Sequence, residues 1–80
     1  MNAKWEELKK KLDAAEQKAR KNPGHLAKVN PGYYLVLLQG ALWDVFSRED
    51  GNWIAESDNG RNYSNAYPRL WQLKEEMGIA

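Results

Sequence analysis

The first hydrophobic pattern along the chain has the spacing of a helix. Its apolar positions follow one another at intervals of three and four residues and form one narrow seam: Trp5, Leu8, Leu12, Ala15 and Ala19. Asn2 can cap the start of this segment, and Pro23-Gly24 ends it. The pattern predicts an amphipathic helix over residues 3–21, with a seam that narrows from Trp to Ala and permits close packing of the C-terminal half.

Three short apolar runs follow, over residues 33–39, 42–48 and 52–57, and their composition is typical of strands. Asp50-Gly51 is the strongest hairpin signal in the chain, and a two-residue loop there pairs Arg48 with Trp53 and Phe46 with Ala55. Asn59-Gly60 marks a further turn, after which residues 61–64 can add a short fourth strand. We therefore predict a loop over residues 22–32, which hold two Asn-Pro-Gly triplets, and a β-meander over residues 33–64.

Alternation along these strands sorts the side chains onto two apolar faces. One face is expected to carry Tyr34, Val36, Leu38, Trp43, Val45 and Ile54. The other is expected to carry Tyr33, Leu35, Leu37, Leu42, Phe46, Trp53 and Ala55. Asp44 interrupts the second face, where we expect it to pair with Arg48 or to lie at the edge of the covered area. Because both faces need cover, one helix lies on each face, or the sheet bends around one core, or both helices lie on one face and a partner meets the other. A second molecule can pair with a face or with an edge of the sheet.

A second amphipathic pattern closes the chain and predicts a helix over residues 66–77. Its stripe consists of Ala66, Leu70, Leu73 and Met77. Ser64 or Asn65 is expected to cap it, with Pro68 in its first turn and Gly78 after its last. The predicted fold is therefore α+β, in the order α-β-β-β-α. It has a three-stranded antiparallel sheet, room for a short fourth strand, and one helix at each end of a single small domain of residues 1–80.

Composition narrows the chemistry. The chain has 80 residues, no cysteine and one histidine, which excludes disulfides, thiol nucleophiles, cysteine-based zinc sites and paired imidazoles. No nucleophile stands beside a base in any recognised motif, and the glycines fall at turns. We expect no catalytic residues, no metal, no cofactor and no small-molecule substrate. No segment has the length of a membrane span or the pattern of a signal peptide, so the expected location is the cytoplasm.

Charge is unevenly distributed along the chain. Residues 1–32 carry eight basic and four acidic side chains, whereas residues 33–80 carry four basic and seven acidic ones. This asymmetry suggests nucleic acid as an alternative partner. The phosphate-contacting residues would be Lys9, Lys10, Lys11, Lys18, Lys21, Lys28 and Arg61. The order α-β-β-β-α resembles that of the double-stranded RNA-binding domain. That family has a lysine cluster at the start of its second helix, where residues 64–69 of this chain hold Arg69 as their one basic residue.

The function favoured by the sequence is binding to another protein, without catalysis. A small chain rich in Trp and Tyr, with surplus apolar sheet surface, suits an inhibitor or adaptor of the kind encoded by phages or mobile elements, which would act in the host cytoplasm. Aromatic and arginine side chains dominate interface energetics. The candidate contact residues are Tyr33, Arg48, Trp53, Arg61, Tyr63 and Arg69. Self-association of a structural or designed domain is a further alternative, as a homodimer through a spare sheet face or through the seam from Trp5 to Ala19.

Overall fold

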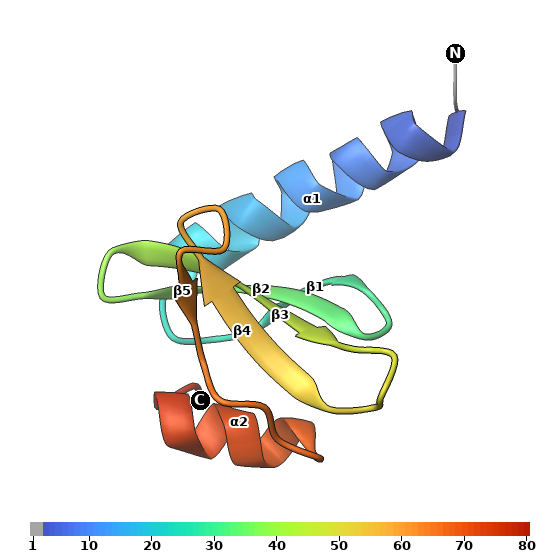
Figure 1. Ribbon diagram of the computed structural model, residues 1–80. Coiled ribbons are helices and arrows are strands. Elements are labelled where there is room, and N and C mark those ends of the chain that lie inside the picture. Colours follow the sequence, from blue (N-terminus) through green and yellow to red (C-terminus); the bar gives the residue numbers. More distant parts are fainter. Residues whose placement is uncertain (1–2) are drawn as a thin grey trace.

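The computed structural model describes residues 3–80 as two helices and one antiparallel sheet (Figure 1). The elements are α1 (Ala3–Lys21), β1 (Ala27–Asn30), β2 (Tyr33–Leu38), β3 (Ala41–Ser47), β4 (Trp53–Ser57), β5 (Asn62–Tyr63) and α2 (Leu70–Met77). The strands lie side by side in chain order, from β1 at one edge to β5 at the other. The α+β class and the helix over residues 3–21 are confirmed, but the sheet has five strands where the sequence predicted three or four. The expected cap Asn2 lies outside the described residues.

The additional strand is β1, so the prediction of an unbroken loop over residues 22–32 is wrong. Ala27 and Val29 are buried beneath α1, and the exposed Lys28 lies between them. Pro31 and Gly32 form the tight turn to β2, with Asn30 opposite Tyr33. Gly32 has φ +84°, a conformation that favours glycine. Residues 27–30 hold only two apolar side chains, which are too few for the sequence to indicate a strand. These two side chains are buried because α1 packs over them.

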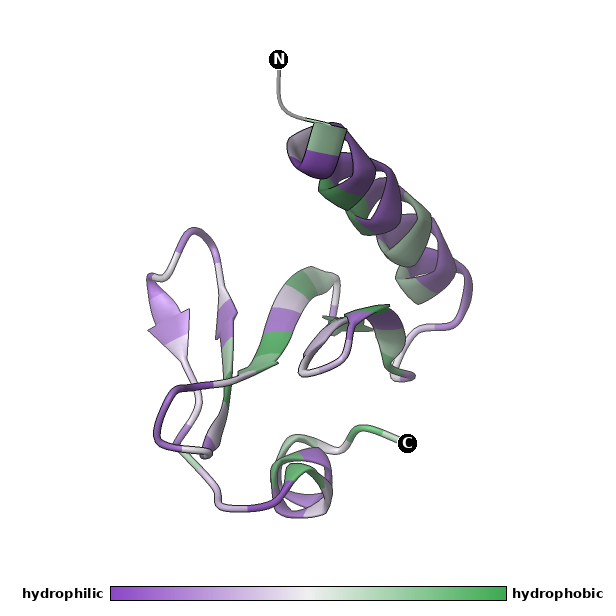
Figure 2. Cartoon of the chain, turned by 90° about the vertical axis from the view of Figure 1, so that its right-hand side faces the viewer, coloured by the Kyte–Doolittle hydropathy of each residue, from purple (hydrophilic) through white to green (hydrophobic). Residues whose placement is uncertain are grey.

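Helix α1 packs across β1 and β2 on one side of the sheet (Figure 2). The buried residues of this cluster are Ala15, Ala19, Ala27, Val29 and Leu35, and Leu8, Leu12, Tyr33 and Leu42 pack around them. The two helix alanines bring the backbone of α1 close to the sheet. The N-terminal turns of α1 extend past the strands, and Trp5 is 58% exposed (Figure 1).

Helix α2 covers the opposite side of the sheet, so one helix lies on each face, as one of the expected arrangements has it (Figure 2). The buried residues of this second cluster are Val36, Val45, Ala55, Leu73 and Ile79. Partly buried aromatic residues, including Tyr34, Trp43 and Trp53, pack against them.

Helix α2 begins at Leu70, four residues later than predicted, and Arg69 is its N-cap in place of Ser64 or Asn65. The backbone of Tyr67 exchanges two hydrogen bonds with Trp53, Trp53 N–H to Tyr67 O at 2.7 Å and Tyr67 N–H to Trp53 O at 2.9 Å, so this segment continues the sheet. Tyr67 precedes Pro68, and a residue before proline is disfavoured in the helical conformation. The sheet contact and the proline therefore delay the helix.

The hairpin between β3 and β4 differs from the prediction by one residue. The Arg48 N–H donates to Asn52 O at 2.8 Å, which makes a three-residue loop of residues 49–51 with Gly51 at φ +84°. Phe46 therefore lies opposite Ile54, and Ser47 lies opposite Trp53. A shift of one residue exchanges the two faces of β4. Trp53 and Ala55 accordingly lie on the α2 side, and Ile54 lies on the α1 side, the reverse of the expectation. The faces predicted for β2 and β3 are confirmed.

Candidate functional site

Helix α1 covers only part of its side of the sheet. Five strands spaced about 4.8 Å apart span roughly 19 Å, whereas a helix with its side chains is about 10 Å wide. Helix α1 lies over β1 and β2 and its cluster includes Leu42 of β3, but α1 does not extend along the rest of this side of β3, β4 and β5. We call this surface the open face. Its residues are Tyr33, Asp44, Phe46, Ile54, Glu56 and Tyr63, of which Ile54 is buried, Tyr63 is exposed and the other four are half-buried.

Strand register places these six side chains on one side of the sheet. Phe46 is the direct neighbour of Tyr33 on one side and of Ile54 on the other. Glu56 lies between Asp44 and Tyr63 in the same manner. Directly paired residues of antiparallel strands share a face. The side chains of Tyr33, Asp44, Phe46 and Glu56 line a shallow hollow of about 230 Å³.

The polar centre of the open face is a pair of carboxylates beside a tyrosine hydroxyl. The Tyr33 hydroxyl donates a hydrogen bond to Asp44 Oδ1 at 3.1 Å. Burial raises the pKa of Asp44, the charge of Glu56 raises it further, and the hydrogen bond from Tyr33 partly offsets both effects. Burial and the adjacent Asp44 carboxylate raise the pKa of Tyr33 to about 12, so its hydroxyl stays protonated at neutral pH.

The two carboxylates have no basic partner on this surface. Asp44 was expected to pair with Arg48 or to lie at the edge of the covered area. The pairing does not occur, because the Arg48 guanidinium binds Asp50 at 2.8 Å in the hairpin turn. Within residues 3–80 no salt bridge involves Asp44 or Glu56. Like charges directly opposite one another on a sheet destabilise it. A bound cation would therefore be stabilised here more than at an isolated surface carboxylate.

Tyr63 forms the outer rim of the open face and is 60% exposed. Its hydroxyl lies over Gly60, only 2.8 Å from where a Cβ atom on that residue would be. Glycine at this position therefore leaves room for the tyrosine ring beside the β4–β5 turn.

The six residues proposed for protein binding do not form one surface. Tyr33 and Tyr63 lie on the open face. Trp53 lies on the α2 side, 6.0 Å from the ring of Tyr34, and packs against the core there. The three arginines are dispersed: Arg48 lies in the β3–β4 hairpin, Arg61 in the β4–β5 turn and Arg69 at the start of α2.

Four open-face residues were not selected as binding residues from the sequence, namely Asp44, Phe46, Ile54 and Glu56. Phe46 and Glu56 alternate with core residues along their strands, so they resembled ordinary strand positions. A three-residue β3–β4 loop would have placed Ile54 beside Phe46 and Glu56 beside Asp44. The two-residue loop predicted from the sequence gave a different register, so these residues were not recognised as neighbours.

Most of the predicted phosphate-contacting residues gather along α1 and β1. Lys4, Lys11 and Lys18 are spaced seven residues apart and therefore share one flank of α1. Lys11 Nζ donates to Asn30 Oδ1 at 3.3 Å, which places this flank over the β1 edge, whereas Lys28 is paired with Tyr34 and points to the α2 side of the sheet. Lys9, Lys10 and Lys21 lie elsewhere around α1. Arg61 lies in the β4–β5 turn, with its guanidinium 3.9 Å from Asp58.

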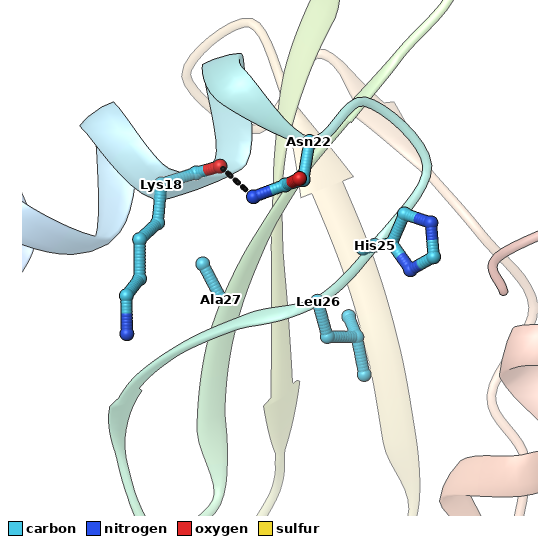
Figure 3. A pocket seen from close by; sticks show the side chains of 5 residues that line it. All are labelled: Lys18, Asn22, His25, Leu26 and Ala27. Atoms are coloured by element: carbon cyan, nitrogen blue, oxygen red, sulfur yellow. Dashed lines mark hydrogen bonds between the residues drawn. The ribbon is translucent and has the colours of Figure 1, made fainter.

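A second hollow, of about 260 Å³, lies where α1 joins β1 (Figure 3). Asn22 Nδ2 donates to the backbone oxygen of Lys18 at 3.4 Å and so caps the end of the helix. The side chains of Lys18 and His25 extend in different directions, so they do not converge on one ligand (Figure 3).

Within residues 3–80, no cluster of His, Asp or Glu side chains is suited to holding a metal ion. Neither described helix is long and apolar enough to cross a membrane. Comparison of the chain with protein-family models, curated proteins and solved structures found no match.

Proposed function

We propose that this chain is a non-enzymatic protein-binding module that holds a basic, partly apolar segment of a protein on the open face. The observation that carries this proposal is the carboxylate pair Asp44 and Glu56, which lies without a basic partner among aromatic and aliphatic side chains.

The chemistry of the open face matches a lysine or arginine side chain. A cation placed there would relieve the repulsion between the two carboxylates and could also contact the rings of Phe46 or Tyr63. The uncovered strands span roughly 10 Å, which is the width of one helix with its side chains. An amphipathic helix with basic residues beside its apolar stripe therefore fits both the shape and the charge.

The same geometry favours binding over catalysis. Enzymes that use two carboxylates hold the reacting bond in a cleft between them. The hollow beside Asp44 and Glu56 is shallow and lies on a sheet surface, so it would not exclude water from a bound substrate.

The test is an NMR titration of the ¹⁵N-labelled chain with two synthetic helical peptides of equal length. One peptide carries leucine and lysine, and the other carries leucine and glutamate. We expect the lysine peptide to shift the amide signals of open-face residues and the glutamate peptide to leave them unchanged. Glu56→Gln should weaken binding of the lysine peptide about 5- to 10-fold. Glu75→Gln, at an exposed position on α2, is the matched control and should not change it. Equal responses to both peptides, or shifts confined to α2, would overturn the proposal.

A second candidate function is nucleic-acid binding along α1, and the observation that favours it is the lysine flank of Lys4, Lys11 and Lys18. Three phosphate contacts predict an affinity about 40-fold weaker at 200 mM salt than at 50 mM, for duplex RNA or DNA. The Lys11→Gln and Lys18→Gln variants should reduce both affinity and salt dependence, whereas Arg61→Gln should not. Absence of binding at the lower salt concentration would exclude this candidate.

A further inference from the structure

The N-terminal turns of α1 carry an apolar seam that nothing in the described chain covers completely. Leu8 and Leu12 pack at the rim of the α1 cluster. The first turns of α1 lie beyond the sheet (Figure 1), and Trp5 in these turns is 58% exposed. A tryptophan can bury roughly 150–250 Å² of surface. Short helical segments without packing are marginally stable in water. An extended helix end that presents a tryptophan is therefore well suited to pack against another surface.

The N-terminal end of α1 carries basic side chains, which the open face lacks. Residues 3–12 carry four lysines and two glutamates, a net charge of +2, whereas the open face carries two carboxylates and no basic residue. Lys9 follows Trp5 by one helical turn, so the two side chains lie next to each other on the surface of α1. Their combination of an aromatic ring and a cation complements Phe46 and Glu56.

We propose that the partner held by the open face is α1 of a second copy of this chain. Trp5 and Lys9 of each copy lie on Phe46 and Glu56 of the other, in a dimer with two-fold symmetry. This inference rests on the proposed function and names its partner.

The two-fold arrangement forms the same contact twice, which suits a small protein. A stable interface of ordinary size buries about 800 Å² on each partner. That is roughly one seventh of the 5698 Å² that the chain exposes. A dimer held by these two contacts therefore has to bury about this fraction of the surface of each copy.

The first test is sedimentation of the full chain over a range of concentrations. We expect a monomer–dimer equilibrium, which Trp5→Ala weakens by roughly tenfold or more. Trp71→Ala is the matched control because Trp71, on α2, is 61% exposed and faces away from the proposed contact. It should leave the dimer constant unchanged. A chain that stays monomeric at every concentration, or equal effects of the two variants, would overturn the inference.

The second test exchanges charges across the proposed contact. Lys9→Glu alone and Glu56→Lys alone each place like charges at both contacts of a homodimer, so each variant should be monomeric. Mixing the two variants restores opposite charges at both contacts and should restore the dimer, as a heterodimer. Failure of the mixture to associate would contradict the proposed pairing, because both chains retain every apolar contact.

The peptide titration separates failure of this inference from failure of the proposed function, and it is carried out on Trp5→Ala to keep the open face unoccupied. A chain that does not dimerise but binds the lysine peptide on the open face excludes the second copy and leaves the proposed function standing. A chain that neither dimerises nor binds the peptide overturns both.

Discussion

The two faces of the sheet are covered by helices of very different length, and the shorter helix makes the more complete core. Helix α2 has 8 residues, and on its side Leu73, Val36 and Val45 are almost entirely buried. Helix α1 has 19 residues, but its own fully buried side chains are Ala15 and Ala19. How firmly a helix is anchored therefore depends on the size and position of its buried side chains and not on its length.

The end of the chain closes the α2 face. Gly78 adopts φ +73°, and the Ile79 N–H then donates to Lys74 O at 2.8 Å. Ile79 is buried against the sheet, and the Ala80 N–H donates to Gly24 O at 2.8 Å. Among the described residues, no comparable segment closes the α1 side over β3 to β5. The α2 side is therefore a closed face with the larger buried side chains, whereas the open face remains partly exposed.

The largest expected effect comes from breaking the closed face. Leu73→Ala removes its largest fully buried side chain and should lower the free energy of unfolding by about 2–5 kcal/mol. Urea denaturation followed by tryptophan fluorescence measures this change. Trp71→Ala, on the exposed side of the same helix, should stay within about 0.5 kcal/mol of the parent chain. Equal losses for the two variants would show that α2 does not anchor the fold through Leu73.

On the α1 side, the expected effect is smaller and comes from overpacking. Ala19 is 1% exposed where α1 crosses the sheet, so Ala19→Leu should force the helix outward at a cost of about 1–3 kcal/mol. Ala14→Leu adds the same side chain at an exposed position of α1 and should be nearly neutral. Comparison of the two denaturation midpoints isolates the contact with the sheet. If Ala19→Leu were as stable as Ala14→Leu, the close approach of α1 would not be required.

The parts of the fold that the sequence predicted well depend on patterns that repeat several times. Five apolar positions at helical spacing specify α1. Six consecutive residue pairs, from Tyr33–Phe46 to Leu38–Ala41, join β2 to β3, and the two residues of each pair lie on the same face of the sheet. An error of an even number of residues in loop length or register leaves every side chain on its predicted face, because successive residues alternate between the two faces. That is why the faces of β2 and β3 were predicted correctly.

The parts that failed depend on single residues or on contacts between distant elements. One extra loop residue beside Gly51 reversed the faces of β4. Strand β1 offers only Ala27 and Val29, whose burial requires α1. The open face was missed for the same reason, because its extent depends on how many strands α1 covers. Pro68 did carry a usable signal, since it disfavours helical geometry at Tyr67.

The smallest predicted effect concerns the carboxylate charge of Asp44 on the open face. The pKa of Asp44 is raised above its ordinary value of 3.8, so the folded chain binds its proton more tightly than the unfolded chain does. Stability from this group is therefore fully present below pH 3.8 and is lost as the pH rises through the raised pKa. Asp44→Asn removes that loss while it keeps an acceptor for the Tyr33 hydroxyl. Because the carboxyl is partly exposed, solvent screening limits the gain at pH 7 to a few tenths of a kcal/mol.

Urea denaturation of Asp44→Asn and the parent chain at pH 3, 5 and 7 checks this sign. The two chains should have equal stability at pH 3, and the variant should become the more stable one as the pH rises. Glu75→Gln, on the exposed surface of α2, should show no such divergence. A variant that is less stable than the parent at pH 7 would mean that the bond from Tyr33 to the charged carboxylate outweighs burial and the repulsion from Glu56. The open face would then be stable without a bound cation, and repulsion between its two carboxylates would no longer favour a basic partner.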